Sequence, residues 1–183
     1  MTSDRGIIEE NTCLLLARWR TVGNERTDHG GLSIEAANEL RGFNEVQVKR
    51  AADVLFPLFG LQGCEDAVIR ALNVDLERDS PYTGRTGDHL VEEENNYLLL
   101  NRWSSCKTSE VYAQSVLGMS ERLISYLRQA TLADLKKVAS MGLRLGSMVT
   151  RPAYLFHSGR NVSLQRSQRT ALAICCSGSW PLT

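Results

Sequence analysis

Basic side chains recur at matching places in two parts of the chain. The first set is Arg41, Lys49 and Arg50, and the second set is Arg122, Arg128, Lys136 and Lys137. Guanidinium and ammonium groups on a helix surface can neutralise the phosphates of a nucleic acid. These residues are therefore the candidate contacts to DNA, although the same residue types also suit a solvated polar helix face.

Two short helices that meet at a tight corner are predicted to carry each set. In the second part, Ser120 and Thr131 are predicted N-caps, and the apolar residues that follow each of them recur at helical spacing. In the first part the corner falls at "GFN", where Asn44 is the predicted cap. A short helix, a turn and a second helix with basic residues outline a helix-turn-helix, but such corners are also common in all-α packing.

The corners belong to a duplicated sequence. "EENTCLLLARW" at 9–19 and "EENNYLLLNRW" at 93–103 are identical at eight of eleven positions. With three extra residues in the second connector, 32–52 also aligns with 119–139. The chain is therefore predicted to be all-α, with two tandem multi-helix units that each contain a helix-turn-helix-like corner. Because the "LLL-x-RW" face is more apolar than one small unit can bury, we expect the copies to pack as a pseudo-symmetric pair.

Composition along the chain suggests four segments. We predict a diverged, acidic repeat at 1–79, a linker at 80–91 with helix-breaking proline and glycine, and a basic repeat at 92–156. Residues 157–183 are predicted to be a basic tail outside the repeats.

The zero net charge conceals an uneven distribution. Residues 1–99 carry 18 acidic and 10 basic residues, and residues 100–183 carry 3 acidic and 11 basic residues. This division fits two halves that attract each other or a complementary subunit, and it also fits a basic surface that faces nucleic acid.

Several classes of function are disfavoured by the sequence. It has no glycine-rich phosphate loop, no H-E-x-x-H and no nucleophile elbow, so we expect no enzyme activity, no catalytic residues and no cofactor. The five cysteines, including Cys175 and Cys176, do not form a zinc-binding pattern, and we expect no metal site. With neither a membrane span nor a signal sequence recognised, we expect a cytoplasmic protein.

The second repeat resembles the FlhD family of bacterial flagellar transcriptional activators. The resemblance covers about 95–150 and is carried by "YLLL" at 97–100, "LGMSERLISYL" at 117–127 and "TLADLKKVA" at 131–139. It implies an all-α activator that pairs with its own kind and joins a zinc-binding partner, FlhC, at promoter DNA to recruit RNA polymerase. The duplication would then place two FlhD-like units in one chain.

Two functions remain open from the sequence. One is a transcriptional regulator that binds DNA with a partner subunit. The other is an interaction protein that binds or titrates an FlhC-like or other regulator without touching DNA, which the acidic first repeat favours.

Overall fold

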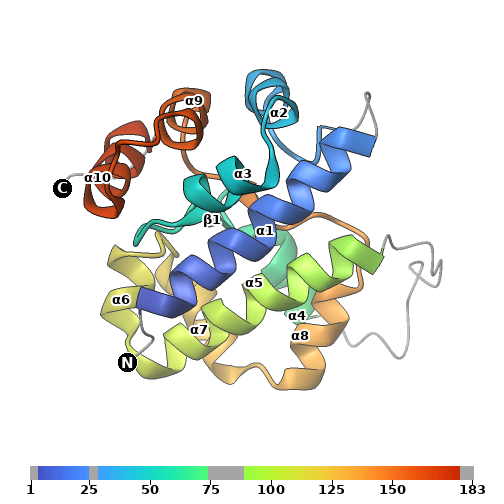
Figure 1. The fold of residues 1–183 in the computed structure, drawn as a ribbon. Helices are drawn as coiled ribbons and strands as arrows, with labels where there is room; N and C mark the ends of the chain where they lie inside the picture. The colour runs from blue at the N-terminus through green and yellow to red at the C-terminus, as the bar shows by residue number, and fades with distance from the viewer. Residues whose placement is uncertain (1–3, 25–28, 74–88, 178–183) are drawn as a thin grey trace. The chain divides into compact units, whose positions relative to one another are not determined.

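The structure, a computed structural model, describes residues 4–24, 29–73 and 89–177. This part of the chain contains ten helices and one sheet of two very short strands, which confirms the predicted all-α class (Figure 1). The helices are α1 (Asp4–Asn24), α2 (Ile34–Arg41), α3 (Glu45–Ala52), α4 (Glu65–Asn73), α5 (His89–Thr108), α6 (Glu110–Ser115), α7 (Glu121–Gln129), α8 (Leu132–Ala139), α9 (Pro152–Arg160) and α10 (Arg166–Cys176). The strands are β1 (Phe59–Gly60) and β2 (Ser147–Met148).

The second repeat reproduces the helices of the first at a constant spacing. Helices α7, α8 and α9 begin 87 residues after α2, α3 and α4, and α5 ends 84 residues after α1. Helix α6 accounts for the longer connector in the second repeat. The repeat thus extends to a fourth helix, α4 or α9, that the sequence alignment did not include.

The helices group into two compact units that are not consecutive in the sequence. Unit 1 comprises Met1–Gly60 and Ser147–Thr183, and unit 2 comprises Leu61–Gly146. Helix α9 packs against α2 and α3 in unit 1, whereas α4 packs against α7 and α8 in unit 2. The fourth helix of each repeat therefore completes the unit built on the other repeat.

This exchange differs from the predicted segment boundaries. A division at 79 assumes that α4 folds with the three helices before it, and a division at 156 passes through α9. Residues 80–88 of the expected linker lie outside the described residues, and residues 89–91 belong to α5. Local sequence could not indicate the grouping, because it depends on which apolar faces meet after the chain has turned.

The two cores are built from equivalent leucines. Leu14 and Leu15 of α1 and Leu98 and Leu99 of α5 are fully buried, whereas Leu100 is 42% exposed. Trp19 and Trp103 are only partly buried. The "LLL-x-RW" face is therefore fully buried at its first two leucines and less buried at its third leucine and its tryptophan.

A short antiparallel sheet lies in unit 1, and its strands follow the third helix of each repeat. Phe59 pairs with Met148 and Gly60 pairs with Ser147. The amide of Val149 also donates to the carbonyl of Leu58 at 2.9 Å. Both strands are too short to show in the periodicity of the sequence.

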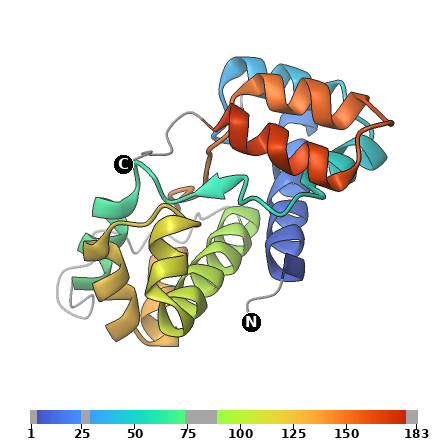
Figure 2. The ribbon, with the colours of Figure 1, turned by 90° about the vertical axis from the view of Figure 1, so that its left-hand side faces the viewer.

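The segment expected to be a tail is part of unit 1. Figure 2 shows α9 and α10 side by side, α9 in orange and α10 in red. The amide of Arg151 donates to the carbonyl of Cys176 at 2.8 Å, which fixes the end of α10 near the start of α9. Helix α10 therefore docks against the core, and its basic residues are not free to reach a partner as a tail would be.

Candidate nucleic-acid interface

The helix-turn-helix corner of unit 2 is formed by α7 and α8. The hydroxyl of Ser120 accepts from the amide of Leu123 at 3.2 Å and caps α7. Thr131 and Asp134 form a capping box at the start of α8. The amide and hydroxyl of Thr131 donate to the Asp134 carboxylate, and these bonds lower the pKa of Asp134 below its usual value of 3.8. The caps leave only a two-residue turn, as the sequence predicted.

Helix α5 supports this corner from behind. The indole Nε1 of Trp103 donates to the carbonyl of Ala130 in the turn at 2.9 Å. The amide Nδ2 of Asn95 donates to the carbonyl of Ala139, the last residue of α8, at 3.1 Å, and to the carbonyl of Leu143 at 2.6 Å. One helix thus holds both the turn and the far end of α8.

Unit 1 repeats this support at the equivalent residues. Trp19 Nε1 donates to the carbonyl of Phe43 at 3.0 Å, and Asn11 Nδ2 donates to the carbonyl of Phe56 at 2.9 Å. Asn44 and Gln47 form the matching capping box of α3. The duplicated sequence therefore specifies the same hydrogen bonds in both units.

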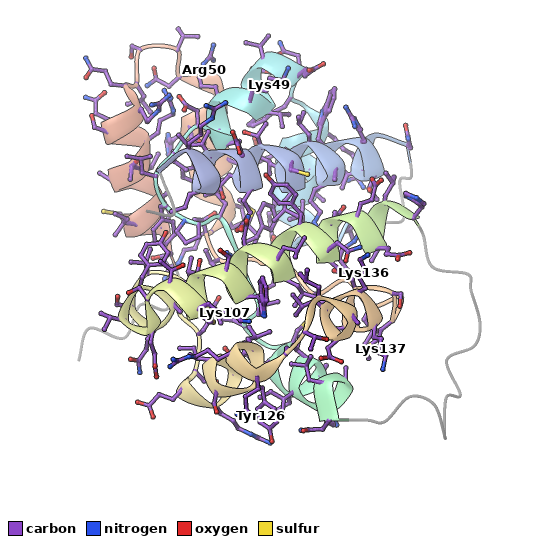
Figure 3. The ribbon with its side chains drawn as sticks, turned by 90° about the horizontal axis from the view of Figure 1, so that it is seen from below. Lys49, Arg50, Lys107, Tyr126, Lys136 and Lys137 are labelled. Atoms are coloured by element: carbon purple, nitrogen blue, oxygen red, sulfur yellow. The ribbon has the colours of Figure 1, made fainter. Side chains whose placement is uncertain are left out.

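Figure 3 labels Lys136 and Lys137 on α8. We call these two residues, with Leu132 and Ala133 of the same helix, the outward face of α8. All four residues are exposed. Neither lysine forms an ion pair within 4 Å among the described residues, although the charge of Lys137 contributes to lowering the pKa of Asp134. Both ammonium groups are thus accessible to a phosphate.

The two arginines of α7 have carboxylate neighbours. Arg122 lies 3.3 Å from Asp66 of α4, and Arg128 lies 2.7 Å from Glu110 of α6. All four side chains are at least half exposed, so the pairs are screened by solvent and weak. The structure places both arginines in the same unit as Lys136 and Lys137, but with part of their charge compensated.

In unit 1 the candidates have structural partners. Arg41 Nε donates to the carbonyl of Val22 at 2.9 Å, and Arg50 Nη1 donates to the carbonyl of Gly159 at 3.0 Å. Lys49 is 2.6 Å from Glu45. Figure 3 labels Lys49 and Arg50 on α3. Arg41 and Arg50 thus link elements of unit 1, and the exposed Lys49 is paired within its own helix.

The arginines of the expected tail are also engaged. Arg160 lies 3.0 Å from Glu39 of α2, and Arg166 and Arg169 both lie 2.7 Å from Asp53 at the end of α3. Arg169 is 7% exposed. The acidic and basic parts of the sequence therefore meet inside unit 1.

Folding largely removes the charge division of the sequence. The described residues of unit 1 include ten basic and seven acidic residues, and those of unit 2 include eight of each. The exchange of α9 causes this change, because the segment 147–177 brings four arginines to the acidic first repeat. The net charge of a unit therefore does not identify an interface, and the charges on individual helix faces must be compared instead.

Sequence reasoning missed the buried polar residues. Glu10, Arg18, Glu94 and Arg102 are at most 3% exposed, and Asn11 and Asn95 are at most 1% exposed. The Arg18 guanidinium lies 5.7 Å from the centre of the Phe59 ring, within range of a cation–π interaction. The available signal was that these polar residues are identical in both copies of the helix, although the exposed pair Glu9 and Glu93 is identical as well.

The remaining features of the described residues concern metal binding and membrane spans. No group of three or more His, Cys, Asp and Glu side chains in the described residues could hold a metal ion, and none of the five cysteines forms a disulfide. Among the helices of the described ranges, none is both long and apolar enough to span a membrane.

The corner of unit 2 is thus one place where exposed basic residues without an ion pair to a described residue lie on a well-supported helix. No protein-family model, curated protein or solved structure matches this chain.

Proposed function

We propose that the chain is a transcriptional regulator of the FlhD-like type that contacts promoter DNA through α8, as one subunit of a larger complex. The observation that carries the proposal is the outward face of α8, where Lys136 and Lys137 are exposed and form no ion pair with a described residue. The outward face of a capped second helix is the part of a helix-turn-helix that enters the major groove.

The comparison with α3 supports the choice of α8. The equivalent face of α3 holds Glu45, which pairs with Lys49, and Arg50 is bound to α9. A face with an acid and engaged bases is a poor match for phosphates. We therefore assign DNA contact to the second repeat and a mainly structural role to the bases of the first.

The proposed partners follow from the resemblance and from the small size of the basic face. Two lysines neutralise few phosphates, which gives weak binding at physiological salt. A partner subunit of the FlhC type would supply further contacts, and RNA polymerase would be recruited by the assembled complex. Self-association through further FlhD-like pairing belongs to the same proposal.

Purification of the tagged chain from its native host tests this function. We expect a second protein and DNA fragments that share a sequence to copurify. A mobility shift with short labelled duplexes made from the recovered fragments should then weaken steeply between about 50 and 200 mM salt. A protein partner without DNA, and no mobility shift with that partner present, would contradict the proposal.

The second candidate is an interaction protein that binds or titrates a regulator. The engagement of the basic residues in unit 1 and the balanced charge of unit 2 favour it. In that case the complex would form with the same partner, and replacing Lys136 and Lys137 by alanine would leave its properties unchanged.

A further inference from the structure

The contacts of α9 and α4 with their units differ at equivalent positions. Gly159 of α9 faces the ring of Phe43 in the corner of unit 1, so closely that a Cβ on Gly159 would lie 2.2 Å from Cε2 and 2.3 Å from Cζ. The ring belongs to a side chain that is 5% exposed, so it cannot swing into solvent. Only glycine fits at this position of α9.

In unit 2 the residue in the corner is small and the residue on the fourth helix is large. Counting 87 residues along the repeat, Phe43 corresponds to Ala130, and Gly159 corresponds to Leu72 of α4. Ala130 is 7% exposed and Leu72 is partly buried. A large corner residue therefore meets a glycine of α9 in unit 1, whereas in unit 2 the corresponding residues are an alanine in the corner and a leucine on α4.

The charged contacts of α9 with α2 also differ from those of α4 with α7. Helix α9 is bound to α2 by the ion pair between Arg160 and Glu39. Between α4 and α7, the exposed pair of Asp66 and Arg122 adds a weak attraction, and Glu65 Oε1 accepts from the amide of Ser120 at 3.1 Å. The counterpart of Arg122 in unit 1 is Glu35, so α4 on the surface of α2 would place Asp66 near a second carboxylate.

We propose that the surface formed by α2 and α3 and the surface formed by α7 and α8 each recognise one particular helix of the chain, α9 and α4 respectively, by size and charge. Each surface rejects the fourth helix of its own repeat. On α2 and α3, Leu72 would overlap Phe43, and on α7 and α8, Gly159 would leave a void beside Ala130. Each repeat therefore accepts the fourth helix of the other repeat and rejects its own.

A first experiment tests, in the full chain, whether the sizes of the residues at 43 and 159 must match. Gly159→Leu should lower the melting temperature by about 5 °C or more, because overpacking a rigid site is costly in a domain of this size. Phe43→Ala with Gly159→Leu reproduces the alanine–leucine pair of unit 2 and should recover most of that loss. Gly23→Ala, on an exposed part of α1 where a Cβ meets nothing within 4 Å, is the matched control and should not lower the melting temperature.

A second experiment measures recognition. In the full chain, residues 152–160 are replaced by the α4 sequence "EDAVIRALN", and hydrogen exchange of α2 and α3 is followed. We expect protection of both helices to fall at least tenfold, and to return when Glu35→Arg and Phe43→Ala convert the α2 and α3 surface to the unit 2 type. Two results of the helix replacement would overturn the proposal: unchanged protection of α2 and α3, or no recovery of protection when Glu35→Arg and Phe43→Ala are added. In the first experiment, an equal drop in melting temperature for Gly159→Leu alone and for Gly159→Leu with Phe43→Ala would also overturn it.

Discussion

The side-chain amide of Asn95 donates a hydrogen bond to the carbonyl of Leu143 at 2.6 Å, 48 residues further along the chain. The same side chain accepts from the amide of Leu145 at 3.0 Å and donates to Ala139. One buried asparagine therefore satisfies the main chain where α8 ends and the chain turns away. Asn11 makes the equivalent contacts with Phe56 and Leu58 in unit 1.

Asn95→Ala should lower the free energy of unfolding by about 2 to 4 kcal/mol, since several buried main-chain groups lose their partner at once. Urea unfolding measures this, and Asn11→Ala should give a similar loss. Asn38→Ala is the control, because Asn38 is exposed and its side chain bonds, among the described residues, only to that of Arg41, so its loss should stay below about 0.5 kcal/mol. A loss as small as the control for Asn95→Ala would contradict the structural role of this residue.

Trp19→Phe and Trp103→Phe should each lower stability by about 1 kcal/mol. Phenylalanine keeps most of the apolar contact but cannot donate to the carbonyl in the corner. Equilibrium unfolding of the two variants checks the prediction, and nearly equal losses are expected because the two bonds are equivalent. A neutral result at both positions would show that the indole bonds do not stabilise the corners.

Arg169 and Arg166 allow a comparison at one carboxylate. Both lie 2.7 Å from Asp53, but the side chain of Arg169 is 8% exposed and that of Arg166 is 55% exposed. Arg169→Ala should cost about 2 to 4 kcal/mol because it leaves a partly buried acid without its inner partner, and Arg166→Ala less than about 1 kcal/mol. Thermal unfolding of both variants measures the two losses of stability. Equal small losses would mean that α10 is only loosely docked.

Cys106 should resist thiol reagents in the folded protein. Burial raises the pKa of its thiol to about 11, so very little of the reactive thiolate exists near neutral pH. Cys13 and Cys175 are exposed and should react first. Alkylation followed by peptide mass spectrometry, with the unfolded chain as the reference for full reactivity, gives the order. Cys106 reacting as fast as Cys13 would contradict its burial.

The sequence predicted the local features of the fold well and the long-range grouping poorly. Ser120, Thr131 and Asn44 cap the helices as expected, because a cap depends on residues within one turn. The exchange of α4 and α9 was not predicted, since it rests on contacts such as Phe43 with Gly159, which are 116 residues apart. The packing of the two units as a pseudo-symmetric pair stays a prediction.

The candidate site was also predicted only in part. Lys136 and Lys137 lie on an exposed helix face, as their spacing indicated. Arg50, the counterpart of Lys137, instead donates to the main-chain carbonyl of Gly159, and Arg41, the counterpart of Arg128, donates to that of Val22. Sequence cannot separate these roles, because the deciding carbonyl of Gly159 comes from a distant helix.

The most direct test of the proposed function is the salt dependence of DNA binding. The complex purified from the host is titrated onto a short fluorescent duplex made from the recovered DNA, at several salt concentrations. Lys136→Ala with Lys137→Ala should flatten the slope of log K against log salt by up to about 1.8, because two phosphate contacts are lost. The control is Arg20→Ala with Lys49→Ala, which removes the same charge from exposed positions of unit 1 and should leave the slope unchanged. Equal flattening by both pairs, or none by either, would contradict DNA contact through α8.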